Sequence, residues 1–188
     1  MFTEVLQVSA RDSLLNVSLR RHWRLAGHNS FRIPAHWRPW LYDAGSLTLR
    51  LQRAAGGKIR VRVLRECWQQ PTTDEARALG MNPRSCALIR EVELLGRNDQ
   101  PWVFARTVIP ATTLSGRERR LRHLGSRSLG SYLFRDPSMQ RTPLRACHLE
   151  DRQQQRYWAR RSIFRLHGKP MLVCEVFLPA MEHVQYPL

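Results

Sequence analysis

The sequence feature that most constrains the fold is a pair of apolar, alternating runs joined by a short polar turn. The runs cover residues 88–95 and 101–110, and Gly96-Arg97-Asn98-Asp99 separates them. Successive side chains of a strand point to opposite faces, and two such runs around a polar turn are typical of a β-hairpin. We therefore expect the chain to fold around an antiparallel sheet.

Each run carries an arginine among large apolar residues. Arg90 shares a strand face with three aliphatic side chains, and Arg106 shares one with two aromatic rings and a valine. A guanidinium stays charged and offers a fork of donors suited to a carboxylate. A buried charge without a partner is costly. The pattern leaves three readings open for such an arginine: a bound anion, an internal ion pair, or an edge position where the charged head reaches water.

A third run, residues 171–179, is apolar on both faces and is therefore typical of a central strand covered on both sides. Glu175 interrupts one of these faces, so we expect it to be largely buried. Glu175 and Arg90 either pair with each other or lie at opposite ends of a pocket and hold one small, polar, anionic ligand. Strand alternation does not separate these two interpretations.

Composition limits the class of protein. The 188 residues suit one domain, and a hydrophobic fraction of 43% is ordinary for a globular protein. No apolar run could span a bilayer and the N-terminus is not typical of a signal peptide, so we expect a cytoplasmic location. The net charge of +16 would suit nucleic acid, a membrane surface or an anionic substrate. Without a zinc-finger, RNA-recognition or helix-turn-helix pattern, we expect no specific nucleic-acid partner and a solvated basic surface.

The cysteines and histidines predict no metal site. None of the four cysteines forms a Cys-x-x-Cys pair, and Cys86 and Cys174 lie in strand-like runs. Reduced, mostly buried thiols are the simple interpretation. The adjacent pair Cys147-His148 lacks the spacing of metal ligands.

Three short helices are predicted from their caps. Thr72-x-x-Glu75 and Ser115-x-x-Glu118 are capping boxes, in which a hydroxyl and a carboxylate satisfy free backbone N–H groups. Ser128 is a plausible N-cap for a third helix, and the free N–H groups there, including that of Leu129, form a ready anion site. An ordinary cap bound by water is the alternative.

Further strands are predicted at residues 58–64, 139–149 and 157–166, the last in a hairpin with 171–179. Cys67–Gln70 are expected to end the pairing of the first of these strands. Residues 47–51 fit either a strand or a helix. Antiparallel strands with a few short helices predict the α+β class. Residues 1–33 are only weakly periodic, and we expect them to form an N-terminal extension of a single domain that covers residues 1–188.

The second half of the chain carries an ordered set of motifs. They are LIRE at 88–91, PW at 101–102, ARTVIP at 105–110, TLSG at 113–116, LGSYLF at 129–134, WARRS at 158–162, GKP at 168–170 and EVFLPA at 175–180. In this order and spacing the sequence resembles the bacterial chorismate pyruvate-lyases. A weaker match extends back to Trp40, and residues before Pro34 have no recognisable counterpart.

The resemblance implies a single antiparallel sheet of about six strands, with flanking helices that enclose the ligand. It also implies a carbon-oxygen lyase that eliminates pyruvate from chorismate to give 4-hydroxybenzoate, which begins ubiquinone biosynthesis in many bacteria. The family needs no metal or organic cofactor and binds its product tightly. We expect a monomer, with chorismate and 4-hydroxybenzoate as its small-molecule partners.

The ligand contacts of the family match Arg90, Glu175 and the backbone at Leu129 and Leu47. By this resemblance Arg90 and the two amides bind the ring carboxylate, and Glu175 faces the 4-hydroxyl, which it orients or deprotonates. A family representative has methionine where this chain has Leu47, a change that a backbone contact survives. The enolpyruvyl carboxylate has three candidate partners, for which surface charge is an equally good account: Arg160, Arg161 and Lys169.

Two other functions fit parts of the pattern. The effector domains of some bacterial repressors are similar in fold and bind small molecules without turnover. They usually follow a DNA-binding helix-turn-helix, which the leading segment lacks. A basic nucleic-acid-binding protein would instead show a steep salt dependence of binding and no activity on chorismate.

Overall fold

The fold is an antiparallel sheet flanked by short helices, seen in a computed structural model that describes residues 23–25, 33–150 and 155–187. Eight strands are present in these residues, in the order β1-β6-β7-β8-β4-β3-β2, with β5 paired to β7 beside this path. Their bounds are β1 Arg24–Leu25, β2 Arg60–Gln69, β3 Ala87–Leu95, β4 Pro101–Pro110, β5 Gln140–Arg141, β6 Arg145–Glu150, β7 Arg156–Leu166 and β8 Lys169–Phe177. The predicted α+β class is confirmed. Six of the strands are longer, as expected, and β1 and β5 have two residues each.

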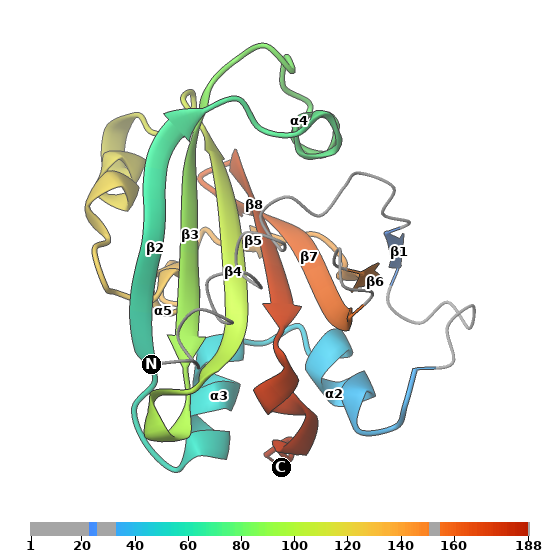
Figure 1. Cartoon of the computed structure of the whole chain (residues 1–188). Helices are drawn as coiled ribbons and strands as arrows, with labels where there is room; N and C mark the ends of the chain where they lie inside the picture. The colour runs from blue at the N-terminus through green and yellow to red at the C-terminus, as the bar shows by residue number, and fades with distance from the viewer. Residues whose placement is uncertain (1–22, 26–32, 151–154, 188) are drawn as a thin grey trace, which may run out of the picture.

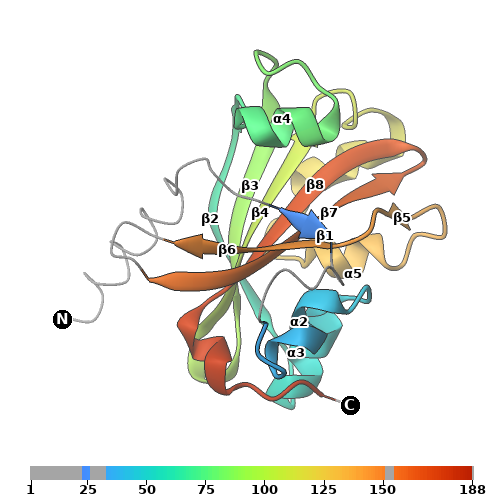
Figure 2. The same ribbon diagram turned by 90° about the vertical axis from the view of Figure 1, so that its right-hand side faces the viewer.

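Short helices cover both faces of the sheet. The α-helices are α2 (Trp37–Tyr42), α3 (Leu47–Ala55), α4 (Thr73–Leu79) and α5 (Leu129–Leu133); the 3-10 helices are η1 (Arg97–Asp99), η2 (Gly116–His123) and η3 (Pro179–His183). Figure 1 shows α2, α3 and the C-terminal segment gathered at one end of the sheet, and Figure 2 shows α4 near the opposite end.

The predicted hairpin is confirmed. Strands β3 and β4 pair antiparallel, and η1 forms the connection. The connection is tight, because a Cβ atom on Gly96 would lie 2.0 Å from the ring of Trp102. Every residue of β3 is buried, and β8 is central, between β7 and β4, as its two apolar faces predict.

Alternation sorts the strand residues into two faces. Arg90 is cross-strand from Thr107, whereas Glu91 is cross-strand from Arg106, so the two arginines of the hairpin lie on opposite faces. We call the side that carries Arg90 the pocket face and the side that carries Arg106 the α4 face. Helices α2, α3 and α5 pack on the pocket face, where two hydrophobic clusters form the larger part of the core.

Some predicted boundaries were wrong. Strand β2 does not end at Cys67 but continues to Gln69, because its pairing with β3 resumes after an irregularity between Val63 and Arg65. Residues 47–51, which fitted a strand or a helix, are the first part of α3. The predicted helix 74–79 is confirmed as α4, with both hydrogen bonds of its capping box present.

The prediction of a capping box at Ser115 was also wrong. Ser115 precedes η2 without a side-chain cap, and its hydroxyl donates to the carbonyl of Thr112. The carboxylate of Glu118 is bound instead by His167 and Lys169 at the β7–β8 turn. A partner distant in sequence therefore outcompetes the local backbone N–H group.

Most of residues 1–33 lie outside the described residues, so the predicted extension stays a prediction. Among the described residues, every helix is too short or too polar to cross a membrane.

Candidate functional site

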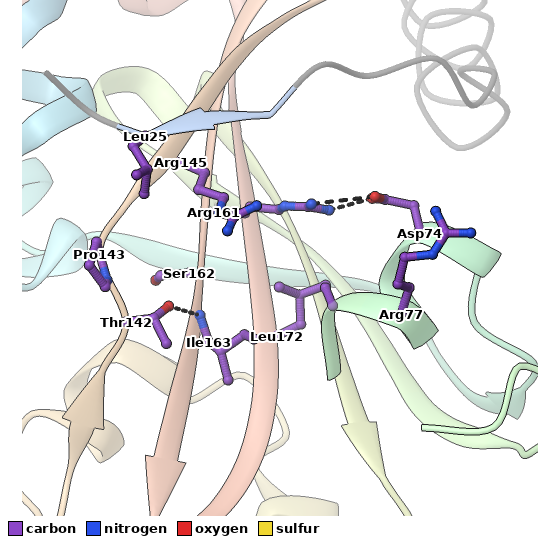
Figure 3. A pocket seen from close by; sticks show the side chains of 11 residues that line it. Leu25, Asp74, Arg77, Thr142, Pro143, Arg145, Arg161, Ser162, Ile163 and Leu172 are labelled. Carbon is purple, nitrogen blue, oxygen red and sulfur yellow. Dashed lines mark hydrogen bonds and ion pairs between the residues drawn. The ribbon is translucent and has the colours of Figure 1, made fainter. Parts of the chain in front are cut away.

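One pocket lies on the α4 face and encloses about 580 Å³. Figure 3 shows Arg161 and Asp74 pointing toward each other there, joined by hydrogen bonds. The guanidinium of Arg161 is buried and also stacks on the ring of Trp23 at 4.4 Å. Its charge is thus already balanced within the protein. The other arginines of this pocket, Arg77 and Arg145, are exposed.

The second pocket, on the pocket face, brings together all four residues matched from the family: Leu47, Arg90, Leu129 and Glu175. Its space is narrow, about 40 Å³, which is room for little more than a few water molecules. A ring-sized ligand needs more room than this, so the pocket must widen when such a ligand binds. The walls are mainly apolar, with a few polar groups, as is usual for small-molecule sites.

Arg90 reaches this pocket from β3 with its side chain only 2% exposed. Its Nη2 donates to the carbonyls of Gly125 at 2.7 Å and Arg127 at 3.3 Å. Its Nε lies 3.3 Å from Glu66 Oε2, an ion pair without the alignment of a hydrogen bond. Burial lowers the pKa of Arg90, and the charge of Glu66 offsets part of this effect. Among the described residues Nη1 has no hydrogen-bond partner, and the side chain lines the pocket.

The starts of two helices meet at the same pocket. Leu47 is the first residue of α3 and Leu129 is the first residue of α5. Serine hydroxyls cap both helices, and the predicted cap at Ser128 is confirmed. A hydrogen bond of 2.8 Å between Thr48 Oγ1 and Ser128 Oγ joins the two helix starts. The first N–H groups of a helix have no partner within it, so these amides are donors at the pocket.

Glu175 enters the pocket from β8 with its side chain 14% exposed, as its strand pattern predicts. Its Oε2 accepts a hydrogen bond of 2.6 Å from Arg160 Nε. Arg160 also donates from Nη1 to the carbonyls of Trp40 at 2.7 Å and Asp43 at 2.9 Å. Glu175 and Arg90 therefore do not pair with each other: each has its own partner, and both line one pocket.

The loop between α2 and α3 is held in place by Asp43. Its carboxylate accepts hydrogen bonds from the backbone of Gly45 at 2.8 Å, from Arg50 Nε at 2.7 Å and from Tyr186 Oη at 2.7 Å. Burial alone would raise the pKa of Asp43, but these hydrogen bonds outweigh it and lower the pKa to about 2. Burial, reinforced by the hydrogen bond to Asp43, raises the pKa of Tyr186 to about 12. The entry to α3 is thus firmly anchored.

The sequence patterns missed one basic residue of this pocket, Arg141 of β5. Its Nε donates to Ser162 Oγ at 2.8 Å, and its Nη1 donates to the carbonyls of Ala44 at 2.8 Å and Gly45 at 3.3 Å. Its guanidinium carbon lies 4.7 Å from the ring centre of Phe164. Because β5 has two residues, no periodicity could reveal the inward direction of this side chain.

None of the three residues proposed to bind the enolpyruvyl carboxylate lines the pocket. Arg160 is occupied by Glu175, and Arg161 lies on the α4 face. Lys169 donates to the carbonyl of Ser115 at 2.7 Å and to Glu118 at 2.6 Å. In the described part of the chain no group of three or more His, Cys, Asp or Glu residues could hold a metal ion.

The sequence matches a family model described as chorismate lyase over residues 19–185. It is 44% identical over 146 residues to a "Probable chorismate pyruvate-lyase" of Marinobacter nauticus, covering 77% of each chain. It is 42% identical over 153 residues to the protein of the same name from Methylococcus capsulatus, covering 76% of this chain and 94% of that one.

Solved structures with a similar fold include regulators of low sequence identity. A GntR-family transcriptional regulator from Bacillus cereus has a TM-score of 0.51 and 13% identity over 69% of this chain and 96% of that one. The C-terminal domain of the histidine utilization repressor from Pseudomonas syringae has a TM-score of 0.51 and 12% identity over 70% of this chain and 99% of that one. These likenesses describe a shared fold and carry no information on activity.

Proposed function

The chain belongs to the chorismate lyase family, and we propose that it converts chorismate into 4-hydroxybenzoate and pyruvate, an early step of ubiquinone biosynthesis. The observation that carries the proposal is the single narrow pocket lined by Leu47, Arg90, Leu129 and Glu175. These residues come from β3, β8 and the starts of α3 and α5. The four positions that match the family in sequence therefore lie around one pocket, which supports the proposal.

In the proposed complex the ring carboxylate lies at Arg90. Nη1 of Arg90 donates a charge-assisted hydrogen bond, and the amides of Leu47 and Leu129 add neutral donors. The ring lies between apolar walls formed by Val92, Leu94, Ala105, Leu133, Phe134 and Val173. Its 4-hydroxyl meets Glu175, whose Oε2 is bound to Arg160 and whose Oε1 is left for the ligand.

The reaction breaks the bond between ring C4 and its hydrogen and the ether bond at ring C3. The electron pair of the C–H bond forms the last double bond of the aromatic ring. The ether oxygen leaves with its own bonding pair as enolpyruvate, which takes a proton at carbon to become pyruvate. Aromatisation supplies most of the driving force, so positioning and charge stabilisation are the main tasks of the protein.

The direct test mixes the purified protein with chorismate, without added metal, and follows both products by chromatography. We expect 4-hydroxybenzoate and pyruvate in equal amounts, far above a control without protein. A folded sample that forms neither product would contradict the proposal. Binding of 4-hydroxybenzoate without turnover would then favour a ligand-sensing domain.

Replacing Glu175 with glutamine is expected to lower kcat by about 100-fold, the scale of a lost general base. The amide oxygen of glutamine can still accept from Arg160, so the local packing survives. Turnover within threefold of the wild type would rule out an obligatory carboxylate base and leave Glu175 with an orienting role. Glu182→Gln, at a carboxylate that is 57% exposed on η3, is the matched control and is expected to change nothing.

The monomeric state, the cytoplasmic location and the absence of a specific nucleic-acid partner stay predictions.

A further inference from the structure

Chorismate carries two carboxylates, and the proposed site so far accounts for one. The ring carboxylate is assigned to Arg90, whereas the enolpyruvyl carboxylate, attached through the ether oxygen at ring C3, has no partner. This second carboxylate leaves with pyruvate and is absent from 4-hydroxybenzoate. Its binding group would therefore distinguish substrate from product, and this inference rests on the proposed function.

Arg141 is the cation in the pocket whose charge is least balanced. It has no ion pair with a carboxylate within 4 Å in the part of the chain that the structure describes, whereas Arg90 lies against Glu66 and Arg160 against Glu175. Burial lowers the pKa of Arg141 to about 10, and the nearby charge of Glu175 recovers only part of this shift. A partly buried cation without an ion-pair partner gains more from an anionic ligand than a paired one does.

One nitrogen of Arg141 is available for a ligand. Nε is used by Ser162, and Nη1 is used by the carbonyls of Ala44 and Gly45. Nη2 has no hydrogen-bond partner among the described residues, although the side chain lines the pocket. The other contacts fix the guanidinium, so its remaining donors are held in place before a ligand arrives.

The position of Arg141 along the pocket also fits. The charges that act on it are those of Glu175, Arg160 and Asp43, which lie at the Glu175 end. In chorismate the ether at C3 is on the ring carbon next to the hydroxyl at C4, whereas one ring atom separates C3 from C1, which carries the ring carboxylate. A substrate with its carboxylate at Arg90 and its hydroxyl at Glu175 therefore brings the enolpyruvyl group toward this end.

We propose that Arg141 binds the enolpyruvyl carboxylate of chorismate through Nη2, and that Arg90 alone among the pocket arginines binds the carboxylate that remains in 4-hydroxybenzoate. When the bond between C3 and the ether oxygen breaks, the leaving enolpyruvate gains a negative charge beside the same guanidinium. Arg141 thus serves both substrate selection and departure of the leaving group.

The test compares chorismate turnover with 4-hydroxybenzoate binding in Arg141→Ala and Arg141→Lys. Loss of one charge-assisted contact is expected to lower kcat/KM for chorismate by 10- to 100-fold in the alanine variant. The lysine variant keeps a charge and is expected to lose less. In both, the Kd for 4-hydroxybenzoate, measured by calorimetry, is expected to stay within threefold of the wild type. Arg165→Ala, at an arginine of the strand that pairs with β5 but outside this pocket, is the matched control.

Three outcomes would overturn the inference. The first is kcat/KM within threefold of the wild type in the alanine variant. The second is an equal loss of 4-hydroxybenzoate binding, which would mean that Arg141 only supports the α2–α3 loop. The third is an effect of the same size in Arg165→Ala. If the alanine variant does not fold, the same comparison is made with Arg141→Lys, whose loss must again be confined to chorismate.

Failure of the proposed function would be visible separately, because the wild type would then form no product. In that case the Kd for chorismate, compared with the Kd for 4-hydroxybenzoate in the wild type and both variants, replaces kcat/KM. A wild type that binds neither compound would overturn both proposals.

Discussion

Replacing Arg90 with alanine is expected to lower kcat/KM for chorismate by at least about 100-fold, because the ring carboxylate loses its charged partner in a desolvated site. Binding of 4-hydroxybenzoate is expected to weaken by a similar factor, because the product keeps this carboxylate. This joint loss differs from the pattern expected for Arg141, where chorismate turnover falls and 4-hydroxybenzoate binding does not. Each arginine variant is therefore a control for the other.

The fold is expected to survive this change. The carboxylate of Glu66, the ion-pair partner of Arg90, is 27% exposed, so it can be hydrated once the guanidinium is gone. Circular dichroism and the melting temperature would establish that the variant is folded before its kinetics are compared. Near-normal turnover by a folded Arg90→Ala would show that the ring carboxylate binds elsewhere.

Arg106→Ala is expected to cost the largest amount of stability, about 3 to 5 kcal/mol of the free energy of unfolding. Arg106 donates from Nε and Nη2 to Glu75, at 2.7 Å and 3.1 Å, and from Nη1 to Glu91. The side chain of Glu91 is fully buried and that of Glu75 is 9% exposed. Removing the guanidinium would leave two buried carboxylates without their counter-ion, and would also remove one of the contacts that hold α4 on the sheet.

Urea denaturation followed by circular dichroism would measure this loss. Arg60→Ala is the matched control, because Arg60 pairs with Asp99 at the surface, where the two side chains are 67% and 57% exposed. Exposed pairs of this kind contribute little. Arg106→Ala is further expected to keep the affinity for 4-hydroxybenzoate in its folded fraction, since Arg106 does not line the pocket. A variant as stable as the wild type would contradict the assignment of this network.

Much of the fold could be predicted from local patterns. The hairpin of β3 and β4, the central strand β8 and the capped helix α4 are each specified by alternation or by a capping box within a few residues. The wrong predictions have one cause in common, which is contact with residues distant in sequence. Ser115 is not a capping box because Glu118 binds residues at a turn far along the chain, and β2 is longer than predicted because pairing with β3 resumes beyond an irregularity.

The site could be predicted only in part. Leu47, Arg90, Leu129 and Glu175 were identified from a resemblance to a family, and the structure places them around one pocket. Their roles stay predictions. The strand predicted at residues 139–149 is in fact two strands, β5 and β6. Arg141 was not identified because β5 has two residues, too few for a period to show which way a side chain points.

By itself the sequence showed that two arginines of one hairpin share strand faces with large apolar side chains, and for each it left open a bound anion, an internal ion pair or an edge position. Only the tertiary structure decided which anion each one meets. On the α4 face, α4 brings Glu75 to Arg106 and closes an internal network with Glu91. On the pocket face, Arg90 lies against Glu66 and lines one pocket with the starts of α3 and α5, and its Nη1 has no hydrogen-bond partner among the described residues. Alternation along a strand depends on neighbours in the chain, whereas the partner of a buried charge depends on which distant segment packs against it.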